Sequence, residues 1–180
     1  MGDPNAPALV SELILRELDR CLVDYVIVGG FAATIYGASR MTTDLDVVAR
    51  WTDSNRERLA TALKNMGAKL RVDGAEEPVS FPLNSGSVGS FELSTWRTDH
   101  GDLDVIIGIP THAKGVLRNF EALLEHAIEV EAFGLTVFVA GLDDIIESKQ
   151  ATGRGTDLQA LPELIELRDQ AARDGGTSSK

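Results

Sequence analysis

Two short stretches of the chain decide its fold, Val28-Gly29-Gly30-Phe31-Ala32 and Arg40-Met41-Thr42-Thr43-Asp44-Leu45-Asp46-Val47-Val48. The first ends an apolar run with a glycine pair, and the second opens another apolar run with two carboxylates. Because side chains alternate along a strand, Asp44 and Asp46 are predicted to share one face, with Leu45 on the other. Adjacent carboxylates repel each other, so the pattern predicts a cation between them.

The glycine pair, Gly29 and Gly30, precedes a predicted helix. A tight turn from strand to helix requires glycine in any case, and the absence of Cβ atoms also lets a phosphate approach the backbone N–H groups. A phosphate-binding turn beside a site for a hard metal indicates phosphoryl or nucleotidyl transfer. Arg40 and Thr42 lie close enough to the acids to contact a phosphate or Asp44, although a surface role for Arg40 is nearly as well supported.

A third acid is predicted from the stretch Gly101-Asp102-Leu103-Asp104-Val105-Ile106, which repeats the Asp-Leu-Asp-Val pattern. A metal site for nucleotidyl transfer generally needs a further carboxylate from a neighbouring strand. Asp102 and Asp104 share a strand face, so either side chain meets that need. The alternative is a turn acid that closes a hairpin.

The order of the predicted elements indicates a mixed α/β (α+β) fold, with a small, partly antiparallel sheet flanked by helices and a helical C-terminal part. We expect one domain over residues 1–173, a disordered tail over 174–180, and a long loop over 74–90 that borders the site. Periodicity and turn residues predict helices over 7–23, 31–36, 52–66, 119–126, 142–151 and 158–172, and strands over 25–28, 44–49, 69–72, 91–97, 103–107, 128–132 and 135–139.

The composition is that of an ordinary globular protein, with 43% hydrophobic and 25% charged residues. The single cysteine, Cys21, excludes an intrachain disulfide and fits a reducing compartment. The first residues lack the basic and apolar segments of a signal peptide, and no apolar run approaches the roughly 20 residues that span a bilayer. These features predict a cytoplasmic protein with no membrane partner.

The net charge of −11 argues against broad binding to a nucleic-acid backbone, which normally needs a basic face. A small anionic nucleotide needs only a few cations, so acidity does not count against that substrate. Basic residues do gather locally, and we favour solvated helix faces over an RNA-binding track for them: Arg56, Arg58, Lys64, Lys69 and Arg71, and separately Lys149 and Arg154.

The motif Gly-Gly-Phe-Ala followed by Arg-x-Thr-x-Asp-Leu-Asp resembles the core signature of the polymerase-β-type nucleotidyltransferases. More narrowly, it is similar to the minimal AbiEii/MenT-type nucleotidyltransferase toxins of bacterial toxin–antitoxin and phage-defence systems. The resemblance extends from about Tyr25 to Leu161. Related transferases more often carry Gly-Ser, and Gly30 stands where that serine would be, a variation that the AbiEii-type proteins also show.

The resemblance implies roles for the acids and for a second block near the C-terminus. Asp44 and Asp46 would hold Mg²⁺, or Mn²⁺, against a triphosphate. Asp104, with Asp102 as the fallback, would take a second metal or accept the proton of the attacking hydroxyl. The block from Leu142 to Leu158 resembles the family's C-terminal signature, which implies nucleotide-binding roles for its polar residues: Lys149 on the triphosphate, Asp157 supporting it, and Arg154 between them. By its position alone, Lys149 is simply compatible with a helix dipole.

The function implied by the resemblance is transfer of a nucleoside monophosphate from an NTP to an acceptor hydroxyl, with release of pyrophosphate. The acceptor would be the 3′ end of tRNA, the donor a pyrimidine nucleotide, and the partner a cognate antitoxin. One alternative changes the acceptor to a protein side chain or to a small molecule such as an aminoglycoside, whose positive charge suits an acidic chain better. Another is a retired nucleotide-binding module, against which the intact carboxylates argue.

Overall fold

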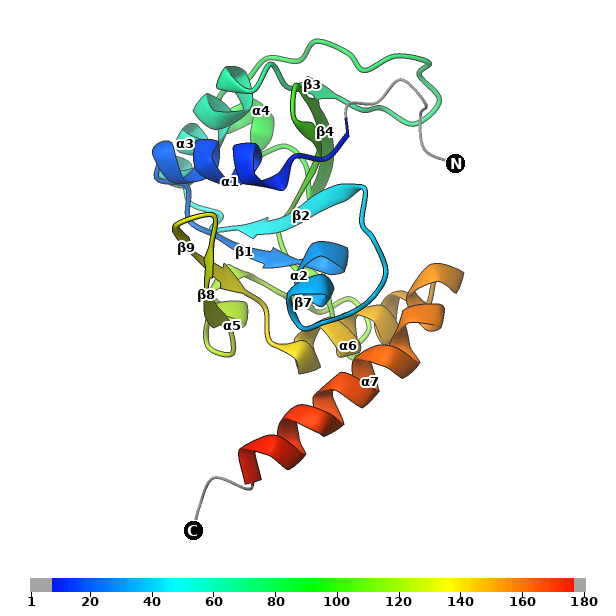
Figure 1. Ribbon diagram of the computed structural model, residues 1–180. Coiled ribbons are helices and arrows are strands. Elements are labelled where there is room, and N and C mark those ends of the chain that lie inside the picture. Colours follow the sequence, from blue (N-terminus) through cyan, green and yellow to red (C-terminus); the bar gives the residue numbers. More distant parts are fainter. Residues whose placement is uncertain (1–7, 177–180) are drawn as a thin grey trace.

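The computed structural model describes residues 8–176, and a seven-stranded mixed sheet forms its centre (Figure 1). This confirms the predicted fold class. The sheet strands are β1 (Tyr25–Val28), β2 (Asp44–Ala49), β3 (Lys69–Leu70), β4 (Leu93–Thr98), β5 (Gly101–Ile106), β8 (Ile128–Ala132) and β9 (Leu135–Val139), and their order is β3-β4-β5-β2-β1-β9-β8. The helices are α1 (Ser11–Arg20), α2 (Gly29–Ile35), α3 (Asp53–Asn65), α4 (Ser85–Val88), α5 (Phe120–Leu124), α6 (Leu142–Thr152) and α7 (Gly155–Gly176).

The central strands are buried because helices lie on both sides of them. Figure 1 shows α1 and α3 on one side of β1 and β2, and α2, α6 and α7 on the other. All four residues of β1 are buried, as a strand covered on both faces requires. Ile14, Leu15 and Leu18 of α1 and Leu59 and Leu63 of α3 are fully buried, and each such side chain stabilises the fold by about 1.5–3 kcal/mol.

The pairing of β2 with its neighbours sets the position of the acidic motifs. β2 runs antiparallel to β1 and parallel to β5. The register places Asp44 opposite Asp102 and Asp46 opposite Asp104. The two Asp-Leu-Asp-Val repeats therefore lie side by side, and both present their acids at the same edge of the sheet.

Local signals in the sequence predicted most boundaries. The Thr52 side chain accepts a hydrogen bond from the Asn55 backbone N–H at the start of α3, and Gly67 follows the helix with a φ of +64°. The helix predicted over 7–23 is shorter, with α1 at Ser11–Arg20, and residue 7 lies outside the described residues.

Two predictions about irregular segments were wrong in part, and one short hairpin was not predicted. The predicted loop over 74–90 contains α4, which is closed by a capping box between Asn84 and Ser87. The segment after β5, for which no strand was predicted, carries a small hairpin of β6 (Ile109–Pro110) and β7 (Leu117–Arg118). The chain remains helical through Gly176, so the predicted disorder does not begin at residue 174, and residues 177–180 lie outside the described part.

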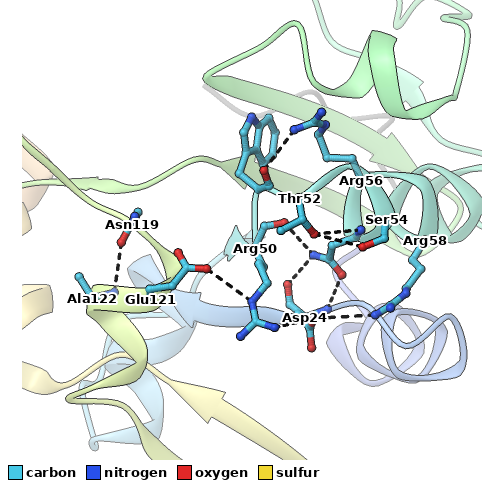
Figure 2. Close-up of polar contacts among 11 residues, drawn as sticks. Asp24, Arg50, Thr52, Ser54, Arg56, Arg58, Asn119, Glu121 and Ala122 are labelled. Atoms are coloured by element: carbon cyan, nitrogen blue, oxygen red, sulfur yellow. Dashed lines mark hydrogen bonds and ion pairs between the residues drawn. The ribbon is translucent and has the colours of Figure 1, made fainter.

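A polar cluster joins the start of β1 to the end of β2, at the opposite strand ends from the acidic motifs. Figure 2 shows the Asp24 carboxylate between the guanidinium groups of Arg50 and Arg58, at 3.3 and 3.7 Å. Asn55, only 1% exposed, accepts a hydrogen bond from the Asp24 N–H at 2.7 Å. Its amide donates to the carbonyls of Asp24 at 2.8 Å and Arg50 at 3.0 Å, so α3 is fastened to both strands.

We expect Asn55→Ala to lower the free energy of unfolding by about 2–3 kcal/mol, because it leaves the buried N–H and carbonyl groups of Asp24 and Arg50 unpaired. Urea unfolding of the purified variant measures this loss. Ser54→Ala on the exposed side of the same turn is the control, with a change within about 0.5 kcal/mol. Equal losses in the two variants would contradict the assigned role of Asn55.

Candidate active site

One cavity brings together ten of the residues that the sequence singled out for the site, and Asp102, the fallback for the third acid, does not line it. Its volume is about 400 Å³, and it lies where the acidic ends of β2 and β5 meet α2, α6 and the start of α7. The ten predicted residues that line it are Gly29, Gly30, Arg40, Thr42, Asp44, Asp46, Asp104, Lys149, Arg154 and Asp157. Residues that are up to 128 positions apart in the sequence therefore share one surface, which their separate motifs could not establish.

The carboxylates of this cavity are held close enough to perturb one another. Burial raises the pKa of Asp46 to about 7, and the negative charges of Asp44 and Asp104 add to the rise. Burial likewise raises the pKa of Asp104 to about 6, with Asp44 and Asp102 contributing. The folded chain thus concentrates negative charge that only protons or a cation can neutralise.

The structure distinguishes the two candidates for the third acid. The Arg71 guanidinium lies 2.8 Å from Asp102, and Arg97 makes a second ion pair with the same carboxylate. Asp104 instead lines the cavity and accepts a hydrogen bond from the Thr95 side chain, while its Oδ1 atom is buried without a hydrogen-bond partner. Asp104 is therefore the acid that is available to a ligand, and Asp102 is neutralised by arginines.

The glycine pair lies directly against the acids. Gly29 has a φ of +67°, and a Cβ atom there would stand 2.0 Å from Oδ2 of Asp46. The Gly30 backbone N–H donates a hydrogen bond to Asp46, which partly offsets the rise of its pKa. In this structure the second glycine thus stabilises a carboxylate. Glycine at residue 29 is required by both its backbone conformation and the close approach of Asp46.

Thr42 and Arg40 hold the loop that leads into β2. The Thr42 hydroxyl lies 2.8 Å from the Asp44 side chain, and a Cβ atom on Gly30 would stand 2.9 Å from that hydroxyl oxygen. Of the two contacts predicted for Thr42, the one with Asp44 is present. The Arg40 guanidinium donates to the Thr156 carbonyl at 3.3 Å, so this loop is tied to the start of α7 while Arg40 lines the cavity.

The cationic side of the cavity comes from the last turn of α6 and the residues that follow it. Lys149 forms a 3.1 Å ion pair with Asp157, and both side chains are mostly buried. The positive charge of Lys149 also lowers the pKa of Asp46. Arg154, in the short connection before α7, lines the same cavity. Asp157 is thus placed to hold Lys149 in position.

The carboxylates fit a hard metal ion by their chemistry. All are oxygen donors, and the unpartnered Oδ1 atom of Asp104 lacks the hydrogen bond that a buried acceptor normally has. Within residues 8–176, no three His, Cys, Asp or Glu side chains form a ready-made metal-binding group. Mg²⁺ does not need one, because it usually binds one or two carboxylates and completes its shell with water and substrate phosphates.

Two further predictions concern the surroundings of the site. The loop over 74–90 was expected to border the site, but none of its residues lines this cavity, and residues 72–78 help to enclose a separate cavity that shares no lining residue with the first. The basic residues near α3 and β3 include three that make ion pairs: Arg56 with Asp53, Arg58 with Asp24, and Arg71 with Asp102. These pairs leave less free positive charge for an RNA-binding track.

The sequence did not reveal the influence of Thr95 on the site, where its side-chain hydrogen bond lowers the pKa of Asp104. Thr95 reaches Asp104 because β4 pairs with β5 in a register that places the two residues opposite each other. The only local signal is the alternating pattern of residues 93–98, which indicates a strand but not its partner. Neighbouring strands must be in place before such a contact exists.

The chain has the fold of nucleotidyltransferases. The lincomycin-bound lincosamide antibiotic adenylyltransferase LnuA matches at a TM-score of 0.57 and 13% identity, over 89% of this chain and 99% of that chain. A putative nucleotidyltransferase from Thermotoga maritima matches at 0.54 and 14% identity, over 91% and 99%. ANT(2″)-Ia in complex with adenylyl-2″-tobramycin matches at 0.53 and 15% identity, over 92% and 87%.

The likeness is one of structure. No protein-family model matches the chain, and no curated protein matches it in sequence. In the described residues, no helix has both the length and the apolar character needed to cross a bilayer.

We expect Gly29→Ala to destabilise the protein more than Gly134→Ala. Both glycines have a positive φ, but a Cβ atom on Gly134 meets nothing within 4 Å. The backbone conformation alone costs about 1–2 kcal/mol for an L-residue, and the collision with Asp46 should add at least about 2 kcal/mol at residue 29. Urea unfolding of both variants checks this, and equal losses would contradict it.

The raised pKa of Asp46 predicts how stability depends on pH. A carboxyl with a higher pKa in the folded state binds protons more tightly there, so the folding free energy weakens as the pH rises from about 4 to 7. Without metal, Asp46→Asn should remove much of this slope and exceed the wild type in stability at pH 8 by about 2–4 kcal/mol.

Thermal unfolding across this pH range, with and without Mg²⁺, measures the effect. Mg²⁺ at pH 8 should stabilise the wild type more than Asp46→Asn. If the stability of the two proteins changed with pH in the same way, the Asp46 carboxylate would not destabilise the folded state as predicted.

Proposed function

We propose that this chain is a Mg²⁺-dependent nucleotidyltransferase that transfers a nucleoside monophosphate from an NTP to the 3′ end of tRNA, as the toxin of a toxin–antitoxin system. The observation that carries the enzymatic proposal is the cavity in which Asp44, Asp46 and Asp104 face the Lys149–Asp157 pair. It combines acids for a metal with cations for a polyphosphate, and nucleotidyl transfer needs both.

In this proposal each side chain has a defined part. Asp44 and Asp46 would hold the metal, which would supply positive charge next to the triphosphate, and Lys149 binds the β- or γ-phosphate while Asp157 keeps Lys149 in place. The acceptor oxygen attacks the α-phosphorus and forms a new O–P bond. The bond from that phosphorus to the bridging oxygen breaks, and pyrophosphate leaves with the electron pair. Asp104 accepts the acceptor's proton through its unpartnered Oδ1 atom, or takes a second metal.

The tRNA acceptor, a pyrimidine donor and a cognate antitoxin are supported by the resemblance to AbiEii/MenT-type toxins. Gly30, in place of the serine of many related transferases, is part of that resemblance. Its N–H is hydrogen-bonded to Asp46, so a serine hydroxyl is not needed to fasten this turn to the acids.

A second candidate acceptor is a small molecule such as an antibiotic. Two neighbours in fold are LnuA bound to lincomycin and ANT(2″)-Ia bound to adenylyl-2″-tobramycin. The net charge of −11 also suits a cationic acceptor. A retired nucleotide-binding module is disfavoured, because such a module has no use for buried carboxylates with raised pKa values.

Incubation of the purified protein with Mg²⁺, total tRNA and each α-³²P-labelled NTP in turn tests the proposal. We expect label in the tRNA band from one pyrimidine NTP. Asp46→Asn should lower the rate at least about 10³-fold, because the metal loses an essential ligand. Asp169→Asn, on the exposed face of α7, is the matched control and should transfer label at the wild-type rate.

The other outcomes separate the candidates. Pyrophosphate release without labelled RNA, together with labelled tobramycin or lincomycin, would favour the small-molecule acceptor. No turnover with any NTP and any of these acceptors would contradict the enzymatic proposal. Label that persists in Asp46→Asn would contradict the assignment of the metal site.

A further inference from the structure

A second cavity, of about 340 Å³, meets the first at the carboxylate pair. Both cavities are lined by Gly29, Asp46, Asp104, Lys149, Arg154 and Asp157. Asp44 and Arg40 line only the first cavity. The acids therefore stand at the junction of two spaces that differ in their walls, and a transfer reaction needs two such spaces, one for the donor and one for the acceptor.

The first cavity is the one suited to the polyphosphate of the donor. Arg40, Lys149 and Arg154 bring three cations to it, and Thr42 and Asp44 complete its polar lining. The second cavity shares Lys149 and Arg154 but lacks Arg40 and the whole loop that leads into β2. Because the triphosphate needs the larger set of cations, the second cavity is left for the acceptor.

Apart from the residues that it shares with the first cavity, the second cavity is lined mostly by aliphatic side chains. Leu93 at the start of β4 and Ile106 at the end of β5 line it from the sheet, and Ile109 and Pro110 of β6 and Ile145 of α6 line it as well. The Leu93 side chain is 52% exposed, which is unusual for a leucine beside a cluster of charged groups. Aliphatic walls suit the apolar face of an uncharged ring.

The same cavity offers little to a polycation. Its carboxylates are Asp46 and Asp104, which the metal would occupy, and Asp157, which is paired with Lys149. The acidic residues Asp73, Glu76 and Glu77 line the separate cavity of residues 72–78 and do not reach this one. An ammonium group placed against the aliphatic walls would lose its hydration without a partner in return.

We propose that the second cavity is the acceptor pocket and that it takes the terminal nucleoside of the acceptor RNA, with Leu93 and Ile106 against the uncharged base or ribose. The proposal rests on the nucleotidyltransferase function proposed above. It places the attacking hydroxyl beside Asp104 and makes Leu93 a residue that determines acceptor specificity. It also disfavours an aminoglycoside in this pocket, despite the acidity of the chain.

Substitution of Leu93 distinguishes an apolar acceptor from a cationic one. We expect Leu93→Ala to raise the KM for tRNA about threefold and Leu93→Glu to raise it about tenfold or more, because contact with the ring is lost and a charge is added. The Kd of a non-hydrolysable NTP should stay within a factor of two. Leu13→Glu on α1, where Leu13 is 42% exposed, is the matched control and should leave both constants unchanged.

A binding measurement tests the pocket without requiring turnover. In protein with labelled isoleucine and leucine methyl groups, saturated with the non-hydrolysable NTP, adenosine should shift the signals of Leu93, Ile106 and Ile109. Tobramycin should shift them less at the same concentration. If adenosine shifts these methyl signals but the protein transfers no nucleotide, the pocket is supported and the proposed function is contradicted.

Three results would overturn the pocket assignment. The first is a KM for tRNA that is unchanged in Leu93→Glu while transfer proceeds, which leaves the function intact but removes the pocket. The second is a fall in acceptor KM in Leu93→Glu with tobramycin as acceptor, which indicates a cationic substrate. The third is the absence of any adenosine-induced shift at the three methyl groups.

Discussion

The parallel pairing of β2 with β5 is the constraint on which the site depends. It places Asp46 opposite Asp104 on neighbouring strands, where two carboxylates lie within one strand spacing of each other. Burial and the charges of neighbouring carboxylates then raise the pKa values of both Asp46 and Asp104, and the fold must supply enough stability elsewhere to hold them there. Apolar packing of α1 and α3 on the sheet, and the hydrogen bonds of Asn55 at the far ends of β1 and β2, supply part of it.

Neighbouring cations offset the repulsion between these carboxylates to different degrees, and this difference creates the candidate site. Arg71 and Arg97 neutralise Asp102, whereas Asp104 keeps an unpartnered oxygen. The positive charge of Lys149 lowers the pKa of Asp46, but Lys149 also forms an ion pair with Asp157. A residual negative charge therefore remains at the junction of a polar cavity and an aliphatic one, where a metal and two substrates would meet.

Strand and helix boundaries followed from local chemistry, so most were predictable. Side-chain alternation placed β2, and the capping threonine and the terminal glycine bounded α3. The irregular segments were harder, because α4 and the β6–β7 hairpin are too short to show a period, and the connection around α4 is stabilised by contacts with α3 such as the Ser85 hydrogen bond to Glu57. The shared fold with chains only 13–15% identical shows how few residues carry the architecture.

The sequence by itself determined which donor groups the candidate site contains and how they are spaced along the chain, because the glycine pair and the two Asp-Leu-Asp repeats are local motifs. It could not decide between Asp102 and Asp104, since both occupy the same strand face. Only the tertiary structure made that choice, through the register of β5 with β4 and β2, which gives Asp102 its arginines and Asp104 its threonine. The two cavities likewise exist only after distant elements pack, because a cavity belongs to the space between elements and not to any one of them.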